Sequence, residues 1–425
     1  MTTGRVAVEP VRVRDVIAES FSGPSPTCVE RNVWGDEWGV LRTTASTIER
    51  GWDWRAHKLL PRSYWGQTAI AVKSGDTIIT KAGPRHRVGV PAFVDEIPAH
   101  IIPSGKMVCL RPDHRKIDPG YLALALLKPA TRRFLNQRTT GMAESQVNFE
   151  NHSLLNAPLW LPGRAEQERV TGSLNDVGAL VASLEQLIAK KRRIKQGMMQ
   201  QLLTGRTRLP GFTGAWKSRR LGDHLVFLRN VALSRAQLDS TSPLRYLHYG
   251  DIHTRESCTL DTATEAMPRA SATLAGRAGR LQVGDLVFAD ASEDVAGIGK
   301  SVEIVGTPTE GAVPGLHTIT ARFDKQVLAN GFKAYLQFNP AFRGALLRLA
   351  SGTKVLATTR SFVAGIEMEV PEVGEQRAIA KVLREAEAEI DALQRRLDTT
   401  RAIKQGMMQE LLTGRTRLGV EGDAA

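Results

Sequence analysis

The chain has 425 residues, of which 42% are hydrophobic and 24% are charged, the ordinary composition of a globular protein. This length exceeds one core and predicts two or three domains. A run of about 18 apolar residues is missing, which argues against a membrane span, and the N-terminus has no apolar signal core, so we expect a cytoplasmic protein. The net charge of +13 favours an anionic partner such as nucleic acid. A basic proteome or a surface adapted for solubility would give the same balance.

Residues 1–160 predict a mixed domain of strands, loops and short helices. Apolar runs at 68–72 and 77–80 flank a Gly-Asp pair, and this pattern predicts a β-hairpin. Residues 107–110 predict a further strand. Asp118-Pro119-Gly120 predicts the start of a helix, because an acidic cap followed by proline suits a first turn.

Two segments of this domain, 81–87 and 141–148, are predicted to be exposed loops because they are polar and contain Gly or Pro. Arginine and lysine also alternate with a group of early tryptophans. Aromatic side chains among basic ones could stack on bases, or they could fill the core of a small domain, and the sequence leaves both readings open. These tryptophans are Trp34, Trp38, Trp52, Trp54 and Trp65.

From residue 164 to 203 the pattern is that of one long helix. Apolar residues recur at alternating spacings of four and three, which is the seam of a coiled coil. The stripe is narrow and its flanks are polar, so we expect packing on another helix; the alternative is packing on the helix's own domain. The seam residues are Val170, Leu174, Val177, Val181, Leu184 and Ile188.

The end of this helix occurs twice. Residues 194–209 and 403–418 are identical at 15 of 16 positions, and the offset is 209 residues. After a skip, both seams are predicted to resume, at Ile194, Met198 and Leu202 in the first copy and at Ile403, Met407 and Leu411 in the second. Two seams in one register most economically pack against each other. The offset carries the seam to Ile379, Leu383, Ala386, Ile390, Leu393 and Leu397.

The segment 210–369 echoes the first domain at a few points. Val283-Gly284-Asp285 lies 209 residues after Ser74-Gly75-Asp76, and Glu375-Gln376 lies 209 residues after Glu166-Gln167. Between these points the two domains differ. We therefore expect two modules of one fold that contact different things.

The candidate catalytic motifs are incomplete. Gly297–Ser301 is similar to the end of a phosphate-binding loop, but a predicted strand follows it where a helix is required. Asn339-Pro340-Ala341-Phe342 lacks the second proline of the Asn-Pro-Pro-Phe motif of adenine methyltransferases, and no Gly-rich cofactor loop accompanies it. The nine histidines show no metal-ligand spacing, and we predict that the three separated cysteines are buried reduced thiols. We predict no active site, metal or cofactor in this chain. The cysteines are Cys28, Cys109 and Cys258.

The repeated Ile-Lys-Gln-Gly-Met-Met-Gln-x-Leu-Leu-Thr-Gly end, preceded by Glu-Gln-Arg-Ala-Ile at 375–379, resembles the specificity subunit of bacterial type I restriction–modification systems. The resemblance extends over the whole chain. The first copy departs from the pattern at 166–170, where the sequence is Glu-Gln-Glu-Arg-Val.

The resemblance implies an α+β fold with a pseudo-twofold internal repeat. Two mixed α/β target-recognition domains, 1–160 and 210–369, would be separated by two long helices, 161–209 and 370–418, conserved in the family and forming an antiparallel coiled coil. Residues 419–425 would be a tail. Each domain would read one half of an asymmetric, bipartite site in double-stranded DNA through the major groove, and the helices would fix the gap.

The same resemblance implies partners that carry out the chemistry. The helices would dock two methyltransferase (M) subunits, which hold S-adenosylmethionine and methylate adenine. Separate restriction/translocase (R) subunits, with Mg and ATP, would cut unmodified DNA. In phage defence this chain would recognise the DNA sequence and set the geometry of the complex. It would carry out no catalysis and bind no membrane.

Contacts with DNA require Lys or Arg on phosphates and Arg, Lys, Asn, Gln, Ser or Thr on base edges. In the first domain the candidates are Lys81, Arg85, His86, Arg87, Arg138, Thr140, Ser145 and Gln146. In the second they are Ser292, Lys300, His317, Thr353, Lys354, Thr359 and Arg360. Any one of them could instead be a solvated loop residue.

Two other classes of function remain as alternatives. A basic coiled-coil adaptor without specific DNA recognition would have the same helices and charge, and it predicts no salt-dependent binding to duplex DNA. A self-contained methyltransferase or nuclease would need the cofactor and metal motifs that are incomplete here.

Overall fold

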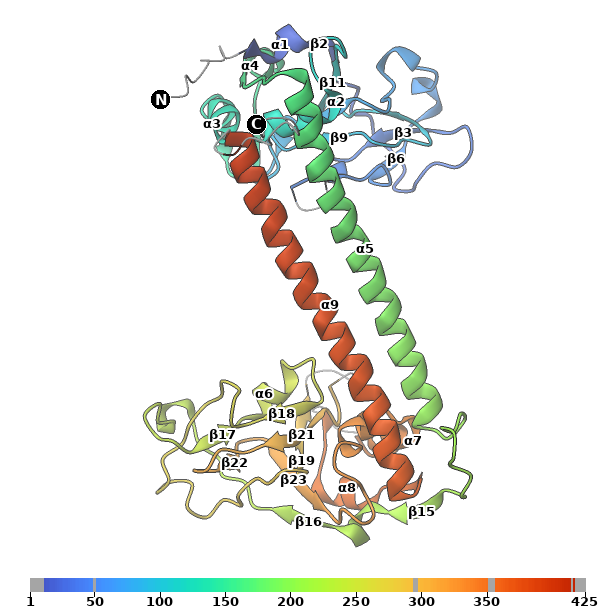
Figure 1. Cartoon of the computed structure of the whole chain (residues 1–425), viewed down its shortest axis with the longest axis vertical. Coiled ribbons are helices and arrows are strands. Elements are labelled where there is room, and N and C mark those ends of the chain that lie inside the picture. The colour runs from blue at the N-terminus through green and yellow to red at the C-terminus, as the bar shows by residue number, and fades with distance from the viewer. Residues whose placement is uncertain (1–10, 49–50, 293–296, 351–355, 414–415, 417–425) are drawn as a thin grey trace, which may run out of the picture. The chain divides into compact units, whose positions relative to one another are not determined.

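A computed structural model describes residues 11–48, 51–292, 297–350, 356–413 and 416. The chain divides into two compact units, unit 1 with Met1–Ser183 and Leu397–Ala425, and unit 2 with Leu184–Arg396. Both boundaries fall inside the long helices α5 (Arg164–Leu202) and α9 (Val373–Thr413), which Figure 1 labels. Each unit therefore combines one domain with one end of each helix, while the five-segment division of the sequence stays a prediction.

Unit 1 combines short helices with several small sheets. Its helices are α1 (Val13–Val16), α2 (Pro119–Leu126), α3 (Pro129–Asn136) and α4 (Asn151–Leu155), with 3-10 turns η1 (Thr43–Ala45), η2 (Arg62–Tyr64) and η3 (Thr68–Ile70). Its strands are β1 (Val11–Arg12), β2 (Ile17–Phe21), β3 (Trp38–Leu41), β4 (Ser46–Thr47), β5 (Gly51–Trp52), β6 (His57–Leu59), β7 (Thr77–Thr80), β8 (Ala82–Gly83), β9 (Pro91–Phe93), β10 (His100–Ile102), β11 (Met107–Pro112), β12 (Thr140–Ala143), β13 (Gln146–Asn148) and β14 (Pro158–Leu159).

Unit 2 has the same kinds of element. Its helices are α6 (Tyr249–His253), α7 (Pro340–Ala350) and α8 (Arg360–Gly365), with 3-10 turns η4 (Leu221–His224), η5 (Arg235–Gln237) and η6 (Lys333–Phe338). Its strands are β15 (Lys217–Arg220), β16 (Leu225–Leu228), β17 (Arg245–Leu247), β18 (Thr259–Asp261), β19 (Leu286–Ala289), β20 (Ala291–Ser292), β21 (Ser301–Gly306), β22 (Ala312–Pro314), β23 (Thr318–Phe323), β24 (Leu356–Ala357) and β25 (Glu367–Val370).

The central sheets of the two units have corresponding strand orders. Unit 1 has β2-β11-β7-β9, and unit 2 has β16-β23-β19-β21 with β18 added in parallel at the edge. Strands β7 and β19 begin 209 residues apart, and both are buried at every position. Their apolar and β-branched sequences suit a strand inside a sheet. The offset seen in the sequence is thus an offset between equivalent elements.

A buried aspartate before each of these strands holds an arginine from the neighbouring strand. Asp76 accepts two hydrogen bonds of 3.0 Å from Arg111, and Asp285 accepts two of 2.7 Å from Arg322. The glycine before each aspartate has a φ of +92°, a left-handed conformation that favours glycine. The Gly-Asp pairs therefore build the same interior in both units.

A buried glutamine fastens each long helix to its domain. Gln167 Nε2 donates to the carbonyl of Pro162 at 2.7 Å, and Gln376 Nε2 donates to that of Pro371 at 2.8 Å. In both units the glutamine Oε1 also accepts a backbone N–H of the domain at 2.8 Å. Because a buried amide needs its hydrogen bonds satisfied, this contact orients the helix as it leaves the domain.

Within each unit the helix segments pack in antiparallel fashion. In unit 2, Lys191 Nζ lies 2.7 Å from Glu389 Oε1, and Lys195 Nζ lies 2.6 Å from Glu387 Oε1, so the numbering rises along α5 as it falls along α9. In unit 1, Val170, Leu174 and Leu411 belong to one core cluster.

The predicted seam lies on the inner side of both helices. Val177, Val181, Ala386 and Leu393 are half-buried, and the other eight seam residues are buried. The predicted continuation of the seam is confirmed in part. Leu202 and Leu411 are buried, and Met198 and Met407 are half-buried. The prediction is wrong for Ile194 and Ile403, which are 45% and 53% exposed. Ile194 follows Ile188 by six residues, about 1.7 turns, which turns it away from the seam.

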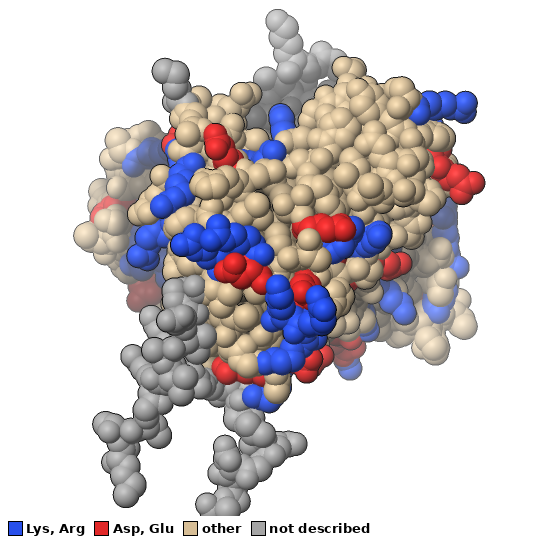
Figure 2. All heavy atoms as spheres, turned by 90° about the horizontal axis from the view of Figure 1, so that it is seen from above, with Lys and Arg blue, Asp and Glu red and all other residues tan. Residues whose placement is uncertain are grey.

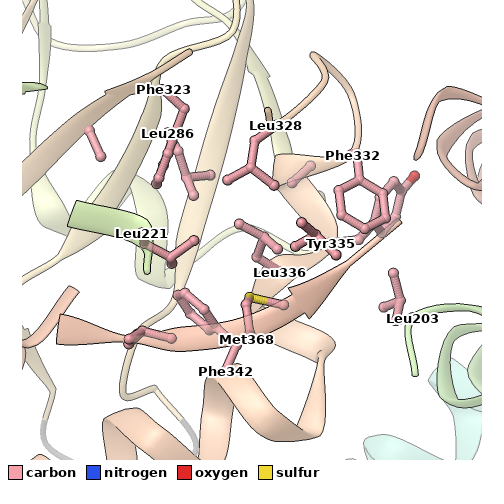
Figure 3. Close-up of a cluster of buried hydrophobic side chains, with 14 of the residues drawn as sticks. Leu203, Leu221, Leu286, Phe323, Leu328, Phe332, Tyr335, Leu336, Phe342 and Met368 are labelled. Atoms are coloured by element: carbon pink, nitrogen blue, oxygen red, sulfur yellow. The ribbon is translucent and has the colours of Figure 1, made fainter. Parts of the chain in front are cut away.

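The ends of the helices also pack into the domain cores. Leu202 and Leu203 join a large cluster of unit 2, where Figure 3 shows Leu203 among the buried side chains with Tyr335 and Phe332. The α9 residue Leu383 joins the same cluster. The two predicted arrangements, packing on another helix and packing on the helix's own domain, are therefore both found in part.

Two predictions for the loops of unit 1 are wrong. Residues 68–70 form the 3-10 turn η3, and β7 pairs with β11 and β9, so no hairpin joins 68–72 to 77–80. Asp76 accepts the backbone N–H of Lys73 within the turn at 2.8 Å, but the strand that follows the turn pairs with β11 and β9, and Asp76 also bonds Arg111 of β11. Residues 141–148 belong to the hairpin β12–β13, which joins β8.

The tryptophans and cysteines serve mainly as core residues. Trp38 and Trp65 pack in one cluster of unit 1 and Trp52 and Trp54 in another, while Trp34 is 77% exposed. All three cysteines are free; Cys109 and Cys258 are buried, whereas Cys28 is half-buried and so departs from the prediction. Burial raises the pKa of Cys258 to about 12, which keeps its thiol protonated.

Candidate DNA interface

A small sheet in unit 1 brings together the two segments that hold the candidate residues of the first domain. In the sheet β12-β13-β8, Val147 pairs with Gly83. The backbone N–H of Arg85 donates to the carbonyl of Glu144 at 2.9 Å. Segments about 60 residues apart in the sequence therefore form one surface.

Several candidates on this sheet have partners within the protein. Arg85 Nε donates to Glu144 Oε2 at 2.7 Å, and both side chains are largely exposed. The Arg138 guanidinium lies 3.6 Å from the centre of the Phe134 ring. Thr140 Oγ1 donates to Asn148 at 3.0 Å. Exposed pairs of this kind stabilise little, so DNA could compete for these side chains. The candidates His86, Ser145 and Gln146 are exposed and Arg87 is half-buried.

Lys81 lies at the base of the same sheet, between β7 and β8. Its Nζ is 3.2 Å from Asn151 Oδ1 and 3.4 Å from Ser22 Oγ, and the side chain is half-buried. An ammonium has three N–H donors. These two neighbours fix its position and still leave it a donor for a ligand.

The second domain places its candidates on several elements. Ser292 lies in β20, which pairs with β24, and Lys300 Nζ donates to the carbonyl of His253 at 2.6 Å. Thr359 caps α8 by accepting the N–H of Phe362 at 3.2 Å. Arg360 donates to the carbonyl of Leu228 at 3.1 Å, so these last two residues have structural partners. The candidates Thr353 and Lys354 lie outside the described residues.

His317 belongs to a cluster of aromatic side chains beside β20. Its Nδ1 lies 3.1 Å from Asp290 Oδ1, and its ring meets Tyr249 edge-on, with centroids 5.4 Å apart. His248 also packs on Tyr249, at 4.4 Å, and burial lowers the pKa of this histidine. At neutral pH His248 is therefore a neutral hydrogen-bonding group.

Equivalent backbone hydrogen bonds show that Lys81 and Asp290 occupy the same position in the two units. The N–H of Lys81 donates to the carbonyl of Lys106 at 2.9 Å, and that of Asp290 donates to His317 at 3.1 Å. The carbonyl of Lys81 accepts from Phe149 N at 3.1 Å, and that of Asp290 accepts from Thr358 N at 2.7 Å; these donors directly follow the strands β13 and β24.

Sequence reasoning selected Lys81 and His317 but missed Asp290, Tyr249 and Lys106. Asp290 lies 209 residues after Lys81, so the offset of the repeat could have identified it. Residue type alone did not indicate Asp290, because the side chains expected to contact an anionic duplex are cationic, hydroxyl or amide groups. Tyr249 gave no signal in the sequence, since its neighbours come together only in the folded unit.

The motifs that suggested chemistry have structural roles. Gly297–Ser301 leads into the strand β21, and its lysine binds a protein carbonyl, as described for Lys300. Asn339 donates to the carbonyl of Leu203 at 2.6 Å and accepts from Ala341 N at 2.8 Å, so it caps two helix ends. Within the described residues, no group of three or more His, Cys, Asp or Glu side chains could hold a metal ion.

Charge on the molecule is mixed and not uniformly basic. On the face that Figure 2 shows, groups of Lys and Arg side chains lie with Asp and Glu side chains among them. Among the described helices, none is long and apolar enough to cross a membrane.

The fold is that of the S subunits of type I restriction–modification systems. The S subunit from M. genitalium matches over 96% of this chain and 98% of its own, with a TM-score of 0.57 and 10% identity. A chain from a structural study of complex assembly and conformational transition of the type I restriction–modification system matches over 96% and 97%, with a TM-score of 0.54 and 15% identity. These likenesses confirm the predicted fold class of two α/β domains with long paired helices.

The sequence is similar to type I specificity subunits over part of its length. The Type I restriction enzyme EcoEI specificity subunit of Escherichia coli is 34% identical over 167 residues, 39% of this chain. The match spans 28% of that relative's own length. No family model matches the chain. The resemblance read from the repeated helix end is confirmed, since the relatives are specificity subunits.

Proposed function

We propose that this chain is the DNA-specificity subunit of a type I restriction–modification complex, without catalytic activity of its own. The observation that carries the proposal is the duplication: two units share a sheet order, a buried aspartate and a fastening glutamine. At the equivalent surface position they differ, with Lys81 in one and Asp290 in the other. Two copies of one reader with different surfaces suit an asymmetric, bipartite target in double-stranded DNA.

The proposed partners are two methyltransferase subunits and the restriction/translocase subunits. Two grooves support two docking sites, one of about 650 Å³ in unit 2 and one of about 630 Å³ in unit 1. Their linings include Arg132 and Arg343, each of which is the fourth residue of a helix that begins with proline, α3 in unit 1 and α7 in unit 2. S-adenosylmethionine, Mg and ATP would be held by those partners in the bacterial cytoplasm.

The test is reconstitution with the adenine methyltransferase subunit of the same restriction–modification system. The chain alone, the methyltransferase alone and the complex are compared for methyl transfer to duplex DNA and for duplex binding as salt increases. We expect transfer only in the complex and binding that weakens steeply with salt. Methyl transfer by the lone chain would contradict the proposal. Methylation by the complex at sites that do not depend on this chain would favour the coiled-coil adaptor.

The spacer role of the helices has its own test. Four residues, about one turn, are inserted within 181–190 of α5, and a matching turn is added within 390–399 of α9. We expect a changed gap between the two half-sites in the methylated motif. A gap that stays the same in a folded, active complex would contradict the spacer role.

A further inference from the structure

The equivalent residues Lys81 and Asp290 differ in more than charge. Lys81 carries only hydrogen-bond donors, whereas an ionised aspartate carries only acceptors. Guanine presents acceptors in the major groove, and cytosine and adenine present amino donors there. One position in the fold thus holds opposite hydrogen-bonding chemistry in the two units.

We propose that this position determines one base in each half-site: Lys81 selects guanine in one half, and Asp290 selects a base with a major-groove amino group in the other. The inference rests on the proposed function and extends it from two readers to two named residues. Cytosine is the expected partner of Asp290, because its N4 amino group pairs well with a single carboxylate.

Asp290 is held toward solvent in a defined orientation. Its carboxylate is 29% exposed and lies beside His317, whose side chain is 50% exposed. Among the described residues, His317 is the non-glycine residue with a positive φ, +56°. Such a backbone is disfavoured for a residue with a side chain, and it persists where surrounding contacts enforce it. The Asp290 bond and the edge-on Tyr249 ring are those contacts.

Among the described residues of the corresponding turn in unit 1, no charged side chain orients Lys81 as His317 orients Asp290. Lys106 occupies the place of His317 and bonds the backbone of Lys81 in the same way. Lys81 is oriented by Asn151 and Ser22 in place of a charged partner. Lys81 and Asp290 are therefore each held by side chains whose hydrogen-bonding groups complement their own charge. A side chain that reads a base edge needs a fixed orientation of this kind.

The experiment uses the full chain in its methyltransferase complex and reads the methylated motif by single-molecule sequencing. The variants are Lys81→Gln in unit 1 and Asp290→Asn in unit 2. Their matched controls are Lys116→Gln and Glu310→Gln, which remove the same charges at exposed positions elsewhere in each unit. Thermal melting checks that each variant folds.

We expect Asp290→Asn to relax one base position of one half-site and Lys81→Gln to relax one position of the other half. The preference at that position should fall roughly tenfold or more, as for the loss of a base contact. Both controls should keep the wild-type motif. His317→Gly, which suits the left-handed backbone but removes the contact that orients Asp290, should relax the same position as Asp290→Asn.

Three outcomes would overturn the inference. The first is an unchanged motif in both folded variants. In the second, Lys81→Gln lowers methylation equally at all sites and reduces the salt slope by about one, which identifies a phosphate contact. In the third, both variants relax the same half-site. If the wild-type complex methylates the same sites with and without this chain, the proposed function itself is contradicted.

Discussion

Asp76 in unit 1 and Asp285 in unit 2 hold an arginine in the same way, whereas the residues five positions further along, Lys81 and Asp290, carry opposite charges. The first pair lies inside the fold and the second reaches the surface. The interior of each unit is thus fixed by shared packing and hydrogen bonds. The surface at the end of the same strand is free to take a different chemistry, and this difference is what two readers of different half-sites require.

The shared interior predicts the largest effect. Asp76→Ala or Asp285→Ala would leave Arg111 or Arg322 without its buried partner, and loss of a buried ion pair costs about 3–5 kcal/mol. Hydrogen exchange followed by mass spectrometry should show the loss confined to the unit that carries the change. Glu310→Ala, at an exposed turn, should alter the free energy of unfolding by less than about 0.5 kcal/mol. If the loss in the free energy of unfolding is large in one unit and small in the other, the two interiors are not equivalent.

The helix pair predicts an intermediate effect in unit 2. Glu387 accepts from Lys195 at 2.6 Å and from Tyr335 Oη at 3.0 Å, and its side chain is 21% exposed. Glu387→Gln should cost about 1–2 kcal/mol, since it removes a charged acceptor from both donors. Glu389→Gln is the matched control and should cost less, because the Lys191–Glu389 pair is more exposed. Equal losses in urea unfolding would contradict this ranking.

Unit 1 lacks this acceptor and can be given one. Gly178 occupies the place of Glu387 in the repeat, and a Cβ there would lie 3.3 Å from Lys404 Nζ, the equivalent of Lys195. Gly178→Ala should raise stability by up to about 1 kcal/mol through helix propensity. Gly178→Glu should add a few tenths of a kcal/mol through the new ion pair. If Gly178→Glu is less stable than Gly178→Ala, the equivalence of these positions fails.

The pH effect that Lys128 produces should fall on unit 1, which contains this residue. Lys128, whose counterpart in unit 2 is Asn339, lies with its Nζ 3.7 Å from the centre of the Trp160 ring, and burial lowers its pKa to about 8. The unfolded chain binds more protons between pH 8 and the ordinary lysine pKa of about 10.4, so unit 1 gains stability as pH rises through this range. Lys128→Asn should flatten the profile relative to wild type. If the free energy of unfolding depends on pH in the same way in both proteins, the lowered pKa of Lys128 is contradicted.

The sequence predicted the features that depend on local pattern or on the repeat. The helix of α5, its seam residues and the strands β7 and β19 follow from periodicity, and the 209-residue offset locates their counterparts. It did not predict that Asp76 bonds a strand distant in the sequence, or that 141–148 add strands to β8. Those contacts are non-local, and no local pattern encodes them.

The candidate DNA interface was predicted less completely. Lys81, His317 and the two loops of unit 1 were identified from residue type, and the structure assembles them around small sheets. Thr359 and Arg360 were selected for the same reason, yet one caps a helix and the other binds a carbonyl. Side-chain chemistry alone does not distinguish a residue that serves the fold from one that serves a ligand.

The most direct test of the central claim exchanges residues 20–158 for the first domain of another specificity subunit and leaves unit 2 and both helices unchanged. The methylated motif of the reconstituted complex is then read by single-molecule sequencing. If each unit reads one half-site, one half of the motif changes, while the other half and the gap stay as they were. A motif that changes in both halves, or in neither, would contradict the account.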